Sequence, residues 1–245
     1  MDTGLKGRTV LVTGASRNMG RLAALAFARE GANIAICTST RMNDLNQVAE
    51  EARAMGVNAV AMQCDITDDT AVGAFVKHSH ATLGRIDVAV NLAGFRCEQP
   101  FLDESHDAWH RNIGVNLTGP YHVCRHVLPL MMERRWGRII NTSGIAPYLG
   151  IGAAKAMVKL GIVGFTRGIA QEFGKYNITA NCFGPGQIAR PAEATVKEKP
   201  IRAVQALQRK GTPEEAISLI IYLASEGAGF ITGQSYLVNG GAYLQ

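Results

Sequence analysis

Short apolar runs alternate with longer amphipathic stretches along all 245 residues of the chain. The runs are rich in β-branched residues and apolar at nearly every position, which is typical of strands buried on both faces of a parallel sheet. We predict strands at Thr9–Val12, Asn33–Cys37, Ala59–Gln63, Val88–Asn91, Arg138–Asn141, Ile178–Phe183 and Ser235–Val238. The stretches between them have helical periodicity, which predicts helices at Arg21–Glu30, Leu45–Met55, Ala71–Leu83, Val115–Glu133, Ala153–Phe173 and Glu214–Ser225.

This alternation predicts an α/β fold with a doubly wound, seven-stranded parallel sheet and helices on both faces. The sequence contains no linker, repeat or low-complexity segment, so we assign residues 1–245 to a single domain. Residues 187–210 form the least regular stretch, which is charged and contains Pro191 and Pro200. We predict that this stretch is a substrate loop or lid over a pocket.

The composition is that of an ordinary globular protein, with 47% hydrophobic and 18% charged residues. The formal net charge is +5, and the basic residues are dispersed without the aromatic-interleaved stretch of a nucleic-acid binder. No apolar stretch approaches the ~20 residues of a membrane span, and the N-terminus lacks an apolar signal core. The five cysteines are scattered, which argues against a disulfide or metal framework. We expect a cytoplasmic protein that binds neither nucleic acid nor membrane.

A glycine-containing turn follows the first predicted strand and leads into a helix. It reads Thr13-Gly14-Ala15-Ser16-Arg17-Asn18-Met19-Gly20. Glycine permits close approach of backbone to a pyrophosphate, and the helix offers free N–H groups with the positive end of its dipole. Asn18 stands at the middle glycine position of such loops, and asparagine tolerates positive φ. We predict that Gly14, Ser16, Arg17, Asn18, Met19 and Gly20 bind a dinucleotide.

The end of the second predicted strand reads Cys37-Thr38-Ser39-Thr40-Arg41 and contains no acidic residue. An acid at this place would bind a ribose 2′-hydroxyl and repel a 2′-phosphate. Arg17 and Arg41 are placed to attract a phosphate, with Thr38, Ser39 and Thr40 as smaller partners. We therefore predict NADP(H) in preference to NAD(H); the alternative is that Arg41 is a solvated surface charge.

Along essentially its whole length the chain resembles the short-chain dehydrogenase/reductase family. The motifs that carry this resemblance are Thr13–Gly20, Asp65-Ile66, Asn91–Gly94, Val115–Gly119, Pro185-Gly186, Ile231–Gln234 and Val238–Gly241. The resemblance implies a Rossmann fold, a small-molecule substrate, and a homo-oligomer that is a tetramer or a dimer. It also implies cofactor contacts from Asp65, Ile66, Asn91, Ala93, Gly94, Lys159, Pro185, Gly186 and Ile188.

The resemblance breaks at the catalytic residues, which in the family are a serine, a tyrosine, a lysine and an asparagine. Asn116 matches the asparagine, and the motif Gly164–Arg167 registers Lys159 as the lysine. The tyrosine position is then Lys155, and the serine position is Gly144, preceded by Ser143. The other registration makes Lys155 the family lysine, but it spoils the downstream match and is rejected.

Lys155 and Lys159 lie one helical turn apart, where like charges repel each other. Burial would lower the pKa of one of them further, and such a lysine serves as a general acid/base or a Schiff-base nucleophile. The alternative is that Lys155 reaches solvent or a phosphate. Tyr148 is a second candidate acid, with Ser143 replacing the lost serine; the alternative is that Tyr148 simply packs on its loop. Further residues expected at the pocket edge are Arg96, Cys97, Glu98, His110, Gln187 and Arg190.

Three functions are compatible with these residues. The first is an NADP(H)-dependent oxidoreductase acting on a small carbonyl, imine or enone, with Lys155, Tyr148 or water as proton donor. The second is a dehydratase, cyclase or lyase that uses Lys155. The third is a catalytically inactive dinucleotide-binding protein or partner subunit. We favour the first, because Asn116 and Lys159 keep their positions.

Overall fold

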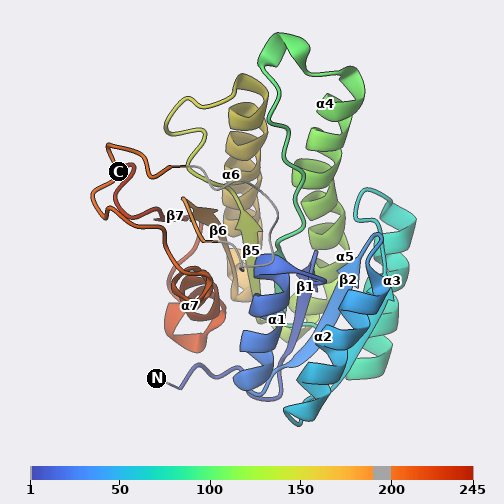
Figure 1. Ribbon diagram of the computed structural model, residues 1–245. Helices are drawn as coiled ribbons and strands as arrows, with labels where there is room; N and C mark the ends of the chain where they lie inside the picture. Colours follow the sequence, from blue (N-terminus) through green and yellow to red (C-terminus); the bar gives the residue numbers. More distant parts are fainter. Residues whose placement is uncertain (1, 190–199, 245) are drawn as a thin grey trace.

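A computed structural model describes residues 2–189 and 200–244 of the chain, which form one seven-stranded parallel sheet (Figure 1). The strand order is β3-β2-β1-β4-β5-β6-β7. The strands are β1 (Thr9–Thr13), β2 (Asn33–Thr38), β3 (Ala59–Gln63), β4 (Val88–Asn91), β5 (Gly137–Thr142), β6 (Ile178–Pro185) and β7 (Ser235–Val238). All seven predicted strands are confirmed. The five inner strands are buried almost throughout between two helical layers, whereas the edge strands β3 and β7 are only partly buried.

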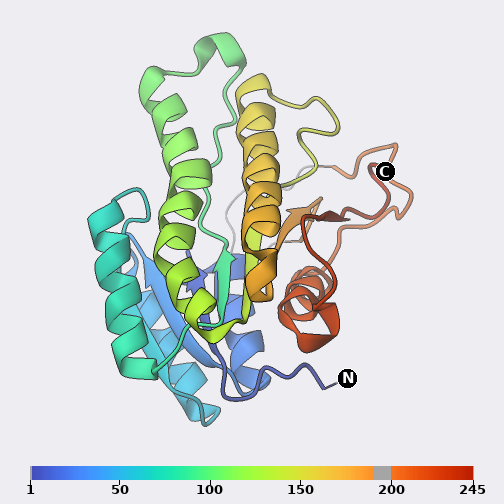
Figure 2. The same ribbon diagram turned by 180° about the vertical axis from the view of Figure 1, so that it is seen from behind.

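Helices cover both faces of the sheet. They are α1 (Asn18–Arg29), α2 (Met42–Ala54), α3 (Asp69–Leu83), α4 (His106–Ile113), α5 (Gly119–Arg134), α6 (Ala153–Phe173) and α7 (Pro213–Ala224). The helices α1, α2 and α7 pack on one face, and α3, α5 and α6 pack on the other (Figures 1 and 2). Each helical layer packs against one face of the sheet and forms a hydrophobic core with it, which confirms the predicted doubly wound fold.

The prediction of a helix at Val115–Glu133 is wrong about where the helix begins. Two further segments precede α5: the helix α4 and a five-residue π-helix at Gly114–Thr118. The side chain of Ser105 caps α4 by accepting a hydrogen bond from the backbone N–H of Ala108 at 3.1 Å. Only three of the eight residues of α4 are apolar, namely Ala108, Trp109 and Ile113, so the helix is too short to show the sustained apolar repeat by which the other helices are predicted.

The predicted lid at residues 187–210 is described only at its two ends, since residues 190–199 lie outside the described part. The Gln187 side chain joins these ends: it donates to the Pro200 carbonyl at 2.8 Å and accepts from the Arg202 N–H at 3.1 Å. Whether the segment is a lid stays a prediction. Among the helices of the described residues, none has the length and apolarity to cross a membrane.

Candidate active site

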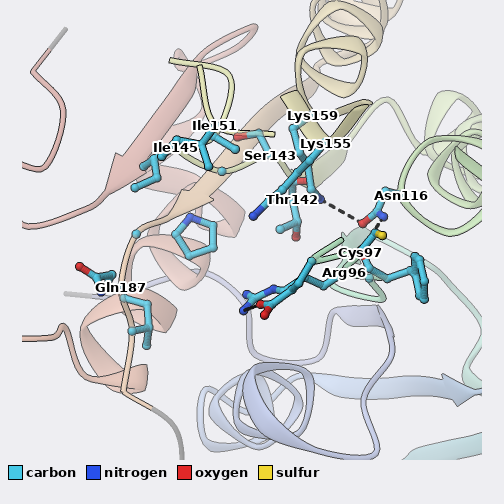
Figure 3. Close-up of a pocket in the computed structure, with 18 of the residues that line it drawn as sticks. Arg96, Cys97, Asn116, Thr142, Ser143, Ile145, Ile151, Lys155, Lys159 and Gln187 are labelled. Carbon is cyan, nitrogen blue, oxygen red and sulfur yellow. Dashed lines mark hydrogen bonds and ion pairs between the residues drawn. The ribbon is translucent and has the colours of Figure 1, made fainter. Parts of the chain in front are cut away.

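A cavity of about 600 Å³ opens at the carboxyl edge of the sheet, next to the point where the strand order reverses between β1 and β4. Ligands of open α/β sheets bind at such a point. Its walls come from the loop after β4 at Gly94, the end of β5 at Thr142, the helix α6, and the end of β6 at Pro185 and Gly186. Segments that are distant in sequence therefore meet around one space, as Figure 3 shows.

Lys159 is held at the inner wall of the cavity by two acceptors. Its Nζ donates to the Thr142 carbonyl at 2.9 Å and to Asn116 Oδ1 at 3.2 Å. An ammonium group has three N–H donors, so one remains for a ligand after these two bonds. The structure thus brings Lys159 and Asn116 together, as the resemblance implies.

Asn116 lies in the π-helix, and its side chain is oriented by acceptors on either side of it in the fold. Its Nδ2 is within hydrogen-bond distance of the Phe95 carbonyl at 2.8 Å and of the Asn112 carbonyl at 3.1 Å. These contacts turn Oδ1 toward Lys159. A π-helix widens the backbone turn and is frequent at functional sites, so the irregular segment between α4 and α5 is part of the site's construction.

Lys155 lies one turn before Lys159 on α6, and both side chains extend into the cavity (Figure 3). The pKa of Lys159 is lowered to about 8, mainly by burial and to a smaller extent by the charge of Lys155. The expected repulsion between the two lysines is therefore seen in the lowered pKa of Lys159. Near neutral pH its ammonium form still predominates, but the amine form becomes accessible.

This pKa predicts how the stability of the protein depends on pH. Lys159 in the unfolded chain has its ordinary value near ~10.4, so between pH 8 and that value the unfolded state binds more protons than the folded state. The free energy of unfolding must then rise with pH. Relative to a Lys159→Met variant, wild type should gain about 2–3 kcal/mol between pH 7.5 and 10.5, measured by urea unfolding. A difference that does not change with pH would contradict the assignment.

The other candidate acids are placed differently. Ser143 is buried at the cavity wall, and its Oγ lies 3.3 Å from Ser235 Oγ and 3.5 Å from the Phe183 carbonyl. The ring of Tyr148 stacks on Tyr243, with the centroids 5.3 Å apart, and Tyr148 does not line the described cavity. Ser143 therefore lines the same cavity as Lys159, with its Oγ near Ser235 and Phe183, whereas Tyr148 lies outside the described lining.

The predicted cofactor turn packs against the loop after β4, which lines this cavity from Gly94 onward. A Cβ on Gly14 would lie 2.7 Å from Ala93 Cα, so only glycine lets the turn pack against the residue that precedes Gly94. Asn18 has φ +49, which confirms that asparagine adopts the left-handed conformation at the middle glycine position. Arg17 precedes α1 without a side-chain cap, and Met19 and Gly20 lie in its first turn.

The segment at the end of β2 that is predicted to contact the ribose contains an ion pair that sequence reasoning missed. Arg41 Nη1 lies 3.2 Å from Asp44 Oδ2, and both side chains are about half exposed. Thr38 is buried, with its Oγ1 3.3 Å from Ser16 Oγ, whereas Ser39 and Thr40 are exposed beside Arg41. The spacing of three residues from Arg41 to the first turn of α2 was the available signal for this pair.

The remaining residues predicted to contact the cofactor include both exposed and buried ones. Asp65 is exposed and accepts from Thr67, whereas Ile66 is buried against Gly119. Asn91 is also buried, and its Nδ2 donates to Asn141 Oδ1 at 2.8 Å, so its side chain braces β4 against β5. The N–H of Ala93 donates to Thr13 Oγ1 at 3.1 Å.

Among the pocket-edge candidates, four line the cavity: Arg96, Cys97, Glu98 and Gln187. Ile188, Pro185 and Gly186 line it as well. His110 is exposed on α4, and Arg190 lies outside the described residues. Sequence reasoning missed Thr142, which binds Lys159 through its carbonyl, because a backbone acceptor leaves no signal in residue type.

Comparison with known proteins identifies the family. The family described as enoyl-(acyl carrier protein) reductase matches residues 14–243. The chain is 35% identical to the 3-oxoacyl-[acyl-carrier-protein] reductase FabG of Pseudomonas aeruginosa, over 98% of this chain and 99% of that one. The chain belongs to the short-chain dehydrogenase/reductase family.

Two further members show the same breadth of similarity. The (2S)-[(R)-hydroxy(phenyl)methyl]succinyl-CoA dehydrogenase subunit BbsD of Thauera aromatica is 33% identical over 98% of each chain. A Sinorhizobium meliloti structure provisionally described as a short-chain alcohol dehydrogenase superimposes with a TM-score of 0.89 at 28% identity, covering 97% of each chain. The chain is therefore of an oxidoreductase type, with the short-chain dehydrogenase/reductase fold.

Proposed function

We propose that the protein is an NADP(H)-dependent oxidoreductase that reduces a small carbonyl, imine or enone compound, with an atypical proton donor. The observation that carries this proposal is the arrangement of Lys159 between Asn116 Oδ1 and the Thr142 carbonyl at the wall of the cavity. When bound, the nicotinamide supplies or accepts a hydride. The residues of the chain orient the reactants and handle the proton.

The described residues fit a dinucleotide. The N-terminus of α1 has no side-chain cap, so its free N–H groups suit the pyrophosphate, with Gly14 allowing close approach. The third N–H of Lys159 suits a hydroxyl of the nicotinamide ribose. Arg17 is an exposed cation in the cofactor turn, and Arg41 is an exposed cation in the segment predicted to contact the ribose; both favour a 2′-phosphate.

Arg41 provides a test of the cofactor preference. Arg41→Ala should raise the dissociation constant for NADPH about tenfold and leave that for NADH within a factor of two, because only the 2′-phosphate needs the guanidinium. Arg29→Ala, an exposed cation at the opposite end of α1, is the matched control. Isothermal titration calorimetry measures both constants. Equal effects on the two cofactors would show that Arg41 does not read the phosphate.

The proton donor follows from the placement of the candidates. In our registration, Lys155 stands at the position of the family's tyrosine, and Gly144 stands at the position of its serine. Lys155 lines the cavity, whereas Tyr148 stacks on Tyr243 away from it. We therefore assign the proton to Lys155 or to a water beside it. A substrate whose reduction creates no alkoxide, such as an iminium or a conjugated alkene, would depend less on the missing tyrosine.

An NADPH-oxidation assay over ketones, imines and enones tests the activity. Turnover of at least one class is expected. Tight NADPH binding without turnover of any class would instead favour an inactive dinucleotide-binding subunit, the alternative suggested by the loss of serine and tyrosine. Oligomeric assembly stays a prediction, to be measured by light scattering.

A lyase or related enzyme using Lys155 is the remaining alternative. It is favoured by the position of Lys155 in the cavity beside a second lysine. Borohydride would then trap a substrate carbonyl covalently on Lys155, and Lys155→Met would abolish the adduct. An untrapped protein that oxidises NADPH would exclude this function.

A further inference from the structure

Two cysteines, Cys37 and Cys64, meet at the carboxyl edge of the sheet, outside the cavity described above. Cys37 lies in β2 opposite Met62 of the parallel strand β3. Alternate residues of a strand point to the same face, so Cys64, two residues after Met62, follows it onto the face that carries Cys37. The N–H of Cys64 donates to the Thr38 carbonyl at 2.9 Å, which holds the two segments side by side. Both thiols therefore belong to one buried cluster on that face.

The two thiols form a hydrogen bond in which Cys37 is the donor. This bond lowers the pKa of the Cys64 thiol, although burial and the carboxylates of Asp65 and Asp68 oppose the effect. The same bond, together with burial, raises the pKa of Cys37. Cys64 is therefore the more easily ionised thiol of the pair, and Cys37 is the neutral thiol beside it. A thiolate next to a second cysteine is the arrangement of redox-sensitive cysteines.

The other buried cysteines lack this activation. Burial raises the pKa of Cys124 to about 12 and that of Cys182 to about 11. Because the thiolate and not the thiol is the nucleophile, both should be inert near neutral pH. Reactivity in the buried core is thus expected at Cys64.

Cys64 is also the member of the pair that lies nearer to solvent. It is 3% exposed, whereas Cys37 is fully buried. Its neighbours in the chain, Gln63 and Asp65, are both exposed, and β3 is an edge strand of the sheet. A small reagent that arrives from solvent therefore reaches Cys64 first.

We propose that Cys64 and Cys37 form a redox-sensitive dithiol that a small hydroperoxide converts into a disulfide. The Cys64 thiolate attacks the O–O bond of the peroxide, which gives a sulfenic acid and releases one oxygen as water or an alcohol. The Cys37 sulfur then attacks the sulfenic sulfur. The S–S bond forms as the S–O bond breaks, and the hydroxyl group leaves as water with the proton of Cys37. Two thiols are oxidised for each peroxide that is reduced.

This disulfide would act on two segments that are predicted to bind the cofactor. The backbone of Gly14 hydrogen-bonds to the Cys37 side chain, and Asp65 follows Cys64 directly. An S–S bond of about 2.05 Å is shorter than any hydrogen-bonded contact between two thiols, so oxidation draws the segment after β3 toward β2. We expect the NADPH dissociation constant to rise about tenfold on oxidation and to recover with dithiothreitol. This consequence rests on the proposed function, whereas formation of the disulfide does not.

Mass spectrometry of the whole chain tests the proposal. The reduced protein is treated with a small excess of hydrogen peroxide, and its remaining thiols are alkylated in denaturant. The mass before alkylation should fall by about two units. Alkylation should then label three of the five cysteines, and peptide mapping should show Cys37 joined to Cys64. Five labelled cysteines, or modification of Cys97 alone, would overturn the proposal.

Serine variants separate the two roles. Cys37→Ser should stop at a sulfenic acid on Cys64, which dimedone traps, whereas Cys64→Ser should leave Cys37 reduced. Cys124→Ala, the matched control, should form the disulfide as wild type does. Mapping of wild type decides the proposal even where a variant fails to fold. Equal NADPH binding by the oxidised and reduced forms would overturn the effect on the cofactor. If reduced wild type binds no NADPH, the proposed function fails, while the peptide map still decides this inference.

Discussion

Replacing Lys155 by tyrosine is expected to raise the rate of NADPH oxidation with uncharged ketones by about 10²-fold or more. The substitution places a phenol at the cavity wall one helical turn before Lys159. The nearby ammonium lowers the pKa of such a phenol, so it can donate a proton to the carbonyl oxygen. The measurement is kcat/KM for a set of neutral ketones, followed by the absorbance of NADPH.

Lys155→Phe is the matched control, because it supplies the same ring without the hydroxyl. Equal rates for the Tyr and Phe variants would show that residue 155 does not face the reacting carbonyl. Gly144→Ser is kept out of this test. Although an added Cβ there would meet no atom within 4 Å, Gly144 has φ +151, a conformation that strains other residues.

Lys159→Met should cause the largest loss of function, lowering kcat/KM about 10³-fold for every substrate that wild type turns over and raising the NADPH dissociation constant about tenfold. The substitution removes the donor between Asn116 Oδ1 and the Thr142 carbonyl and leaves both acceptors without it. It also removes the cation expected beside the nicotinamide ribose. Stopped-flow kinetics and calorimetry measure the two effects.

Two further variants serve as comparisons for Lys159→Met. Lys159→Arg keeps the charge but not the compact shape of the ammonium, so it should restore cofactor binding more than turnover. Lys175→Met changes a lysine outside the cavity and should behave as wild type. Turnover within threefold of wild type for Lys159→Met would show that this lysine is not part of the site.

The apolar runs were sufficient to predict all seven strands, because burial on both faces requires an apolar residue at nearly every strand position. The same logic failed for α4, because a helix of eight residues with three apolar positions is too short to show a sustained repeat. The left-handed conformation of Asn18 could be predicted, because asparagine tolerates positive φ and stands here at a turn position that glycine usually occupies. The stacking of Tyr148 on Tyr243 could not, because it joins segments far apart in sequence.

The basic residues that line the cavity were predictable only in part, for the same reason. Sequence motifs indicated Lys155 and Lys159, and spacing on one helix placed them together. Arg202 and Lys210 reach the cavity through the return of the chain toward β6, where Ala189 N–H donates to the Gly211 carbonyl. No pattern in the sequence specifies that return.

The most direct test of the central claim is transfer of deuterium from NADPH labelled at nicotinamide C4 to a substrate. The protein would be incubated with each epimer of the labelled cofactor and with ketones, imines or enones, and the products analysed by mass spectrometry. An oxidoreductase site at Lys159 predicts a product one mass unit heavier from one epimer only, formed about 10³-fold more slowly with Lys159→Met. Bound NADPH without label transfer to any substrate class would contradict it.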